Sequence, residues 1–247
     1  MPFDVGGNIW NGAMAKVQNS RSIITRGLVL HLDAGVPGSY PGSGTTWSDL
    51  SGNGNNGSFQ GDGVSFSSVN GGSIVFAGSD DYVSFSANDD LDIRNKTATF
   101  CYWAKSSTTS GEFYIISKQD SSGGVYDGYR FGHNSGAWRM RFSDGSNDAE
   151  YTSGAVQNDG TWKYYSFVVG TSNVSVYLDG LLDDGSNDIS SVGDINPAQA
   201  LIIGAGYTGT LQEFTGNIAA VQIYMNKELS AKEVLHNFNA QRDRFGV

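Results

Sequence analysis

The feature that most constrains this chain is a series of short runs in which apolar and polar residues alternate with a period of two. In residues 173–180 (NVSVYLDG), three apolar side chains face one way and three polar side chains face the other. In residues 137–143, Trp138 and Met140 share one face with Phe142, and two arginines share the opposite face. This period is typical of a β-strand with one buried face.

Runs with strand character follow one another at short intervals along most of the chain. They lie at residues 27–34, 72–78, 81–86, 97–105, 112–119, 129–133, 137–143, 161–170, 173–180, 200–205 and 216–225. The tripeptides LDG, SDG, NDG and SGG at the ends of these runs and between them are typical of hairpins and turns, and 34 glycines supply many such turns. No helical pattern separates the strands, so the sequence predicts an all-β fold, an antiparallel two-sheet jelly-roll sandwich.

One short helix is predicted at the C-terminus of the chain. Ser230 and Glu233 have the spacing of a capping box at a helix start. Val234, Leu235 and Phe238 then form an apolar stripe, which we expect to pack against the sandwich.

The charge of the chain divides it into two predicted parts. Residues 1–27 hold three basic residues and one acidic residue, a net charge of +2, whereas residues 28–247 hold twelve basic and 24 acidic residues, a net charge of −12. We interpret 1–27 as an N-terminal arm for attachment or tethering, and 28–247 as the folded domain. An acidic body repels phosphates and anionic lipids, so we expect no nucleic-acid partner. No apolar run approaches the roughly 20 residues of a membrane span, and the first twenty residues lack a secretory signal pattern.

The sequence offers little for catalysis. Sandwich glucanases carry carboxylates at alternate positions of one strand, and no such run occurs here. The three histidines, His31, His133 and His236, lie far apart and lack the spacing of metal ligands. A serine-nucleophile elbow and a phosphate-binding loop are also absent. We therefore predict a protein that is not an enzyme and that requires no cofactor.

Aromatic residues near polar loops are candidates for a glycan site. Sugar rings stack on aromatic faces, while their hydroxyl groups bond to polar side chains. The candidates are Tyr126, Tyr129, His133, Trp138 and Tyr207. The alternative is that these aromatic side chains pack in the core or across strands, as most aromatics of a sandwich do.

The loop at residues 47–59 (WSDLSGNGNNGSF) is a second candidate site. Ca²⁺ takes oxygen ligands from carboxylates, amides and backbone carbonyls, and Asp33, Asp49, Asn53 and Asn55 could supply them. The alternative is a tight turn, since glycine and asparagine adopt left-handed conformations at low cost.

Five segments in order resemble the laminin-G-like, concanavalin A-like jelly-roll domains. They are residues 27–59 (the first strand and its SGNGNNG loop), 75–85 (VFAGSDDYVSF), 97–105 (TATFCYWAK), 159–180 (DGTWKYYSFVVGTSNVSVYLDG) and 214–238 (FTGNIAAVQIYMNKELSAKEVLHNF). The resemblance implies a rim site that often holds Ca²⁺. Ala219 and Ala220 stand where the closing strand of that family often carries an acidic residue, which argues against the ion.

The first loop and the terminal NAQRDRFG are similar to laminin-G-like proteins of tailed phages. That resemblance implies a virion structural or adhesion protein: a capsid decoration or a tail or fibre component, located on the virion. We then expect other virion proteins and further copies of the chain as partners, cell-surface glycan as a ligand, and no membrane insertion. The alternative is a carbohydrate-binding lectin module with Ca²⁺ that is not tied to a virion.

Overall fold

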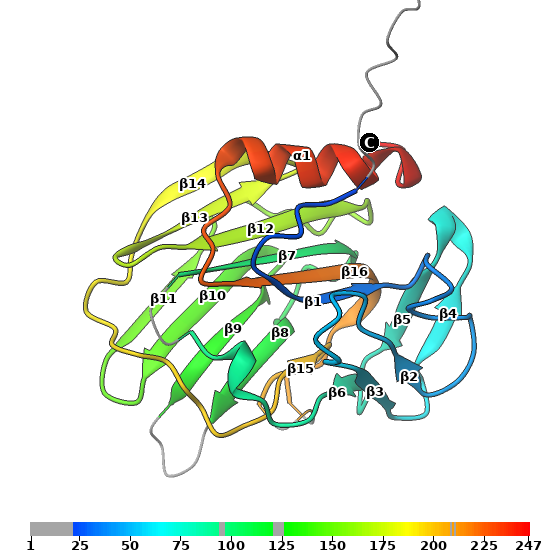
Figure 1. Ribbon diagram of the computed structural model, residues 1–247, viewed down its shortest axis with the longest axis horizontal. Helices are drawn as coiled ribbons and strands as arrows, with labels where there is room; N and C mark the ends of the chain where they lie inside the picture. Colours follow the sequence, from blue (N-terminus) through cyan, green and yellow to red (C-terminus); the bar gives the residue numbers. More distant parts are fainter. Residues whose placement is uncertain (1–21, 94–96, 121–125, 208, 210) are drawn as a thin grey trace, which may run out of the picture.

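The alternating runs form two antiparallel β-sheets packed face to face in the computed structural model, which describes residues 22–93, 97–120, 126–207, 209 and 211–247 (Figure 1). Sheet A contains, from one edge to the other, β14 (Leu181–Asp188), β13 (Asn173–Leu178), β12 (Lys163–Val169), β7 (Ala98–Lys105), β16 (Thr215–Met225), β5 (Ser73–Ala77) and β4 (Ser65–Ser67), with β1 (Leu28–Asp33) also paired to β16. Sheet B contains β11 (Asp148–Thr152), β10 (Ala137–Asp144), β9 (Asp127–Asn134), β8 (Glu112–Asp120), β15 (Ile202–Ile203), β6 (Tyr82–Ser84), β3 (Gly57–Gln60) and β2 (Thr46–Trp47).

The fold class predicted from the sequence is confirmed. Each strand pairing in the described part of the chain is antiparallel, and neighbours in a sheet are often distant in sequence, as β7 and β16 are. The remaining elements are short: the 3₁₀ turns η1 (Val69–Gly71), η2 (Asp89–Leu91) and η4 (Arg242–Arg244), and the helix α1 (Ala231–Gln241).

The inner faces of the two sheets form the main core. Phe131 of β9 lies between Phe100 of β7 and Phe167 of β12, at ring-centroid distances of 4.5 and 4.7 Å. Burial of one such side chain contributes roughly 1.5–3 kcal/mol. Trp138 and Met140 are buried on the inner face of β10, as their alternation predicts.

Helix α1 covers the face of sheet A that is turned away from sheet B (Figure 1). The predicted capping box is present: Ser230 Oγ accepts a hydrogen bond from Glu233 N at 3.3 Å, and Ser230 N donates to Glu233 Oε2 at 2.8 Å. Val234 and Phe238 are buried against the sheet, whereas Leu235, the third residue of the predicted stripe, is 39% exposed. The contact with sheet A is therefore narrower than the sequence predicts.

The predicted N-terminal arm is described only in part, because residues 1–21 lie outside the described residues. Residues 22–27 lead into β1 and run beside α1. Ile24 N donates to Asn237 Oδ1 at 2.8 Å, and Tyr224 Oη donates to the Ile24 carbonyl at 2.9 Å. The last residues of the predicted arm thus contact the sandwich, and the boundary at residue 28 stays a prediction.

Candidate functional site

The face of sheet B that is turned away from sheet A carries charged and aromatic side chains. In β9, Tyr129 and Phe131 are buried in the core, so Arg130 between them points to the outer face. Arg130 pairs with Ser117 of β8 on one side and with Arg141 of β10 on the other. The strand register therefore brings three polar side chains side by side.

An irregularity in β8 adds a tyrosine to this outer face. The register shifts between Tyr114 and Ile116: Tyr114 pairs with Gly132, and Ile116 pairs with Phe131. The shift lets Ile116 enter the core while Tyr114 remains outside it, above Arg130. Bulges of this kind redirect side chains and are frequent next to functional sites.

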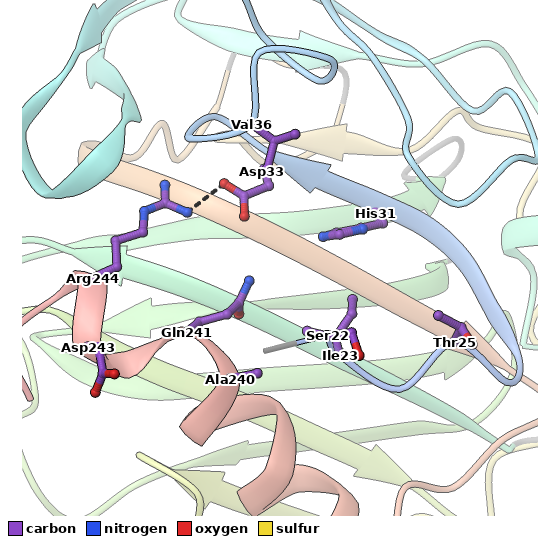
Figure 2. Close-up of a pocket in the computed structure, with 10 residues that line it drawn as sticks. All are labelled: Ser22, Ile23, Thr25, His31, Asp33, Val36, Ala240, Gln241, Asp243 and Arg244. Atoms are coloured by element: carbon purple, nitrogen blue, oxygen red, sulfur yellow. Dashed lines mark hydrogen bonds and ion pairs between the residues drawn. The ribbon is translucent and has the colours of Figure 1, made fainter. Parts of the chain in front are cut away.

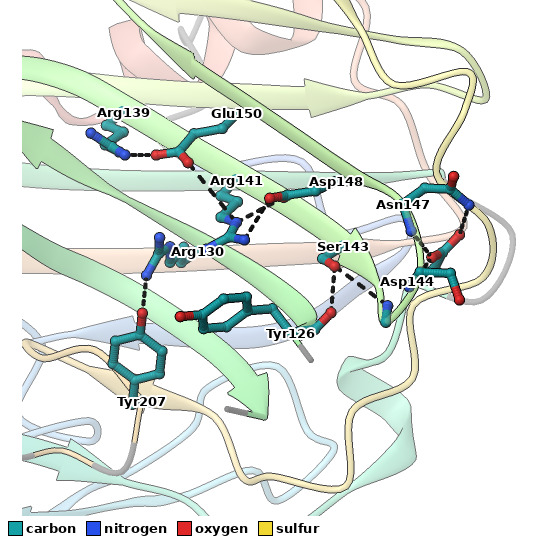
Figure 3. Close-up of polar contacts among 12 residues, drawn as sticks. Tyr126, Arg130, Arg139, Arg141, Ser143, Asp144, Asn147, Asp148, Glu150 and Tyr207 are labelled. Carbon is teal, nitrogen blue, oxygen red and sulfur yellow. Dashed lines mark hydrogen bonds and ion pairs between the residues drawn. The ribbon is translucent and has the colours of Figure 1, made fainter. Parts of the chain in front are cut away.

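Two tyrosines from loops cover the arginines. The ring of Tyr126 lies 4.1 Å from the Arg141 guanidinium, and the ring of Tyr207 lies 5.4 Å from that of Arg130 (Figure 3). The two tyrosine rings are 6.2 Å apart, and both residues are partly exposed. Cation–π contact with a guanidinium holds a ring in place without covering its other face. Residues 81 positions apart therefore form one aromatic surface.

Two of the arginines on this face have their own carboxylates. Arg141 binds Asp148 through two hydrogen bonds, of which Nε to Oδ1 is 2.7 Å long. Arg139 pairs with Glu150 of the neighbouring strand β11 (Figure 3). The two arginines of β10 and the two carboxylates of β11 thus neutralise each other's charges.

In the part of the chain that the structure describes, Arg130 has no such close carboxylate. Its Nη1 donates to Tyr207 Oη at 2.8 Å, and Glu112 Oε1 lies 3.9 Å from its Nη2. Arg130 is only 4% exposed, and burial lowers the pKa of its guanidinium. A guanidinium stays charged in proteins, so this buried charge is compensated less well than its two neighbours.

Among the described residues, several buried polar atoms around Arg130 lack a hydrogen-bond partner. They are Arg130 Nε, Arg139 Nε, Glu112 Oε1, Tyr114 Oη, Ser117 Oγ and both amide atoms of Gln119. An unsatisfied buried polar group costs about 1–3 kcal/mol, so a cluster of them calls for an explanation. We call the outer-face residues Tyr114, Ser117, Gln119, Tyr126, Arg130, Arg139, Arg141 and Tyr207 the arginine–tyrosine face.

The candidate glycan residues divide into two groups. Tyr126 and Tyr207 lie on the arginine–tyrosine face and are partly exposed. Tyr129, His133 and Trp138 are 0–1% exposed and point into the sandwich. Strands β9 and β10 continue up to the two-residue turn that joins them, so these three residues lie within strands and not in a loop. Their side chains take inward positions in the strands and present no ring to a ligand.

Each inward aromatic has a structural role. Tyr129 Oη donates to the Leu91 carbonyl at 2.8 Å, and Trp138 Nε1 donates to Asp183 Oδ2 at 2.6 Å. His133 packs between two aromatic rings of the core, and burial lowers its pKa to about 3. It is neutral at physiological pH.

The carboxylate of Asp49 is occupied by the protein itself. Its Oδ1 accepts hydrogen bonds from His31 N and Ser51 N, both at 2.9 Å. Its Oδ2 accepts from Ser51 Oγ at 2.7 Å and from Asn55 N at 3.1 Å. A carboxylate offers about four acceptor positions, and here all are used to close the loop.

The two candidate asparagines bind the free edge of β1. Asn53 Nδ2 donates to the Leu28 carbonyl at 3.2 Å, and Asn55 Nδ2 donates to the Val29 carbonyl at 2.9 Å. With Asp49 they replace a neighbouring strand along this edge, which otherwise has free hydrogen-bonding groups. The side chains of Asp49, Asn53 and Asn55 thus form the hydrogen bonds that a neighbouring strand would otherwise form with β1.

Asp33, the fourth metal candidate, lies at the other end of β1. Its Oδ1 pairs with Arg244 Nη1 at 2.6 Å and accepts from Gly35 N at 2.8 Å. It lines a cavity of about 400 Å³ between β1, residues 22–25 and the C-terminal turn (Figure 2). Across the described ranges, three or more His, Cys, Asp or Glu side chains do not come together in a group that could hold a metal ion.

Arg130 and the other two arginines of this face are not among the candidates that the sequence indicates. The position of Arg130 between the inward aromatics Tyr129 and Phe131 is a usable signal, because alternation places it outward. The grouping of Arg130 with Arg141 and Tyr207 depends on strand register and on loop placement, which the sequence does not display.

The sandwich, its covering helix and its aromatic outer face define a lectin-like jelly-roll domain. Residues 77–235 match the Laminin_G_3 model, and the chain belongs to the concanavalin A-like lectin/glucanases superfamily. None of the curated proteins that were compared matches the chain in sequence.

Solved structures with this fold include toxin binding domains. The binding domain of Paraclostridial Mosquitocidal Protein 1 is 17% identical, with a TM-score of 0.69 over 87% of this chain and 52% of that one. The receptor binding domain of botulinum neurotoxin C/D mosaic serotype is 16% identical, with a TM-score of 0.68 over 88% and 52%. The botulinum neurotoxin serotype D ligand binding domain, in complex with N-acetylneuraminic acid, is 16% identical, with a TM-score of 0.66 over 88% and 52%.

These similarities concern the fold, because the identities are low, and the chain spans about half the length of the toxin domains. Within the described residues, helices long and apolar enough for a membrane span do not occur.

Proposed function

We propose that this chain is a non-enzymatic glycan-binding module whose ligand lies on the arginine–tyrosine face. The observation that carries the proposal is the pair of partly exposed rings of Tyr126 and Tyr207, 6.2 Å apart and backed by guanidinium groups. A sugar ring stacks its apolar face on such rings. The polar atoms around Arg130 are buried, and hydroxyl groups of the ligand reach them when the Tyr207 hydroxyl leaves Arg130.

The comparisons support a binding role. The family is lectin-like, and the similar structures are binding domains of toxins, one of them in complex with N-acetylneuraminic acid. The carboxylates of Asp148 and Glu150 are each paired with an arginine, which leaves them poorly suited to proton transfer. We therefore propose binding without hydrolysis.

A glycan array tests this proposal. We expect the full chain to bind a restricted set of glycans, and Tyr126→Ala and Tyr207→Ala each to weaken binding at least tenfold. Tyr177→Ala is the matched control, since Tyr177 is a partly buried tyrosine that packs on the opposite side of the molecule, against the cluster under α1. Silence across a broad array, or equal losses in all three variants, would contradict the proposal.

We further propose that the module is displayed on a tailed-phage virion, as a capsid decoration or a tail component, with other virion proteins and its own copies as partners. The support is the phage-type form of the first loop and of the C-terminus, together with the opposite charges of residues 1–27 and 28–247. Mass spectrometry of purified particles tests the location. Deletion of residues 1–27 without loss of incorporation would contradict attachment through the arm.

A further inference from the structure

We propose that the ligand of the arginine–tyrosine face carries a carboxylate, and that this carboxylate pairs with Arg130. This inference rests on the proposed glycan-binding function and narrows its ligand to acidic sugars. It starts from the three arginines of the face, which differ in how directly each contacts a carboxylate.

The three arginines differ in their partners. Arg141 and Arg139 each contact a carboxylate of β11 directly. Arg130 has a neutral hydroxyl, Tyr207 Oη, as its close partner, while Glu112 Oε1 lies 3.9 Å from its Nη2 and 3.4 Å from Arg139 Nε. Glu112 balances the formal charge of the face without a close hydrogen bond to Arg130, so Arg130 is the guanidinium that can still take a directly bonded carboxylate.

The groups around Arg130 match the rest of an acidic sugar. Arg130 Nε has an unused hydrogen, and Ser117 Oγ and the Gln119 amide, on the neighbouring strand, lack partners as well. A guanidinium binds a carboxylate through two parallel hydrogen bonds, which a sugar hydroxyl cannot reproduce. Hydroxyl and amide groups beside it suit the polar substituents of the same ring.

Tyr207 determines access to this guanidinium. Its hydroxyl holds Arg130 Nη1, and its backbone has a φ of 52°, in the left-handed region that a residue other than glycine rarely adopts. Such backbone outliers occur frequently at ligand clamps. A carboxylate that replaces the Tyr207 hydroxyl on Arg130 would leave the ring free to stack on the sugar.

The test compares each acid with its own neutral ester. The probes are 3′-sialyllactose and digalacturonate, each beside its methyl ester, titrated into the full chain by calorimetry. We expect the acid to bind on the order of tenfold to a hundredfold more tightly than its ester in at least one pair, which is the effect of a charge-assisted hydrogen bond. The pair that shows the difference identifies the class of acidic sugar.

Substitutions test whether the preference for the acid over the ester depends on the guanidinium of Arg130. Arg130→Gln is expected to lower the affinity for the acid to that for the ester. Arg242→Gln, which changes an exposed arginine of the turn η4 outside this face, is expected to keep the preference for the acid. If Arg130→Gln does not fold, the Nε–H resonance of Arg130 in the unaltered protein provides the readout, and we expect it to shift with the acid and not with the ester.

The outcomes separate the two proposals. Equal affinity for acid and ester, or array binding restricted to neutral glycans, would overturn the inference and leave glycan binding supported. Absence of binding to these probes and to every array glycan would overturn the proposed function, and the inference with it.

Discussion

Arg244 and Asp33 are 211 positions apart in sequence, and their side chains form an ion pair of 2.6 Å between Nη1 and Oδ1. Arg244 Nε also donates to the Asn70 carbonyl at 2.7 Å, and Nη2 donates to the Gly72 carbonyl. One side chain thus joins the C-terminal turn η4 to the end of β1 and to the turn η1. Asp33 therefore serves the fold, as a buried acceptor.

Arg244→Ala is expected to lower the free energy of unfolding by about 2 kcal/mol, because it leaves the buried Asp33 carboxylate without its partner. Urea denaturation measures this change. The exposed Arg242 lies in the same turn, so Arg242→Ala is the control and is expected to change stability by less than about 0.5 kcal/mol. Similar losses in both variants would show that the ion pair is not the cause.

Asp49→Asn tests the role of the first loop. The substitution replaces one acceptor oxygen by a donor, and at least one of the four donors now bound by Asp49 loses its partner. We expect the midpoint of thermal unfolding to fall, by the equivalent of about 1–3 kcal/mol.

The same loop gives an expectation for Ca²⁺. Because protein donors occupy the Asp49 carboxylate, we expect a chelator to leave the melting temperature of the unaltered chain unchanged. A rise in melting temperature on addition of CaCl₂ that disappears in Asp49→Asn would instead establish a calcium site at this loop.

His133 should make the protein sensitive to acid. Burial lowers its pKa from 6.5 to about 3, so the unfolded chain binds a proton more readily than the folded chain between these values. Stability is then complete above pH 6.5 and falls by about 1.4 kcal/mol per pH unit towards pH 3.

His133→Phe keeps an aromatic ring between Phe113 and Tyr165 and removes the titrating group. Between pH 5.5 and 4 we expect the unaltered chain to lose about 2 kcal/mol more than the variant, measured by urea denaturation at each pH. Parallel pH curves for the two proteins would contradict the assignment to His133.

The sequence predicts the architecture well, because each strand has its own local pattern. The alternation in 173–180 and 137–143, and the Ser230 capping box, depend on neighbours within a few residues, and the structure confirms them. Leu235 shows what such local patterns do not predict. Whether a residue at the side of a helical stripe is buried depends on the orientation of the helix on the sheet.

The site was predictable only in part. Trp138 lies near polar loops in the sequence, which makes it a candidate ligand contact, but its alternation with Met140 and Phe142 places it in the core, and the structure follows the alternation. The sequence indicates Tyr126 and Tyr207 only as aromatics near polar loops, and their contact depends on how two separate loops are placed. Arg130 becomes distinctive only when the partners of Arg139 and Arg141 are known, which requires the register of β9, β10 and β11.

The most direct test of the central claim is to map the bound glycan by NMR. The best array ligand is titrated into isotope-labelled full-length chain, and the shift changes of assigned side-chain and backbone signals are followed. We predict that the largest changes occur at Tyr126, Tyr207 and Arg130. The account would be contradicted if the changes were concentrated instead at the Asp49 loop or in the cavity beside Asp33, while the arginine–tyrosine face stayed unaffected.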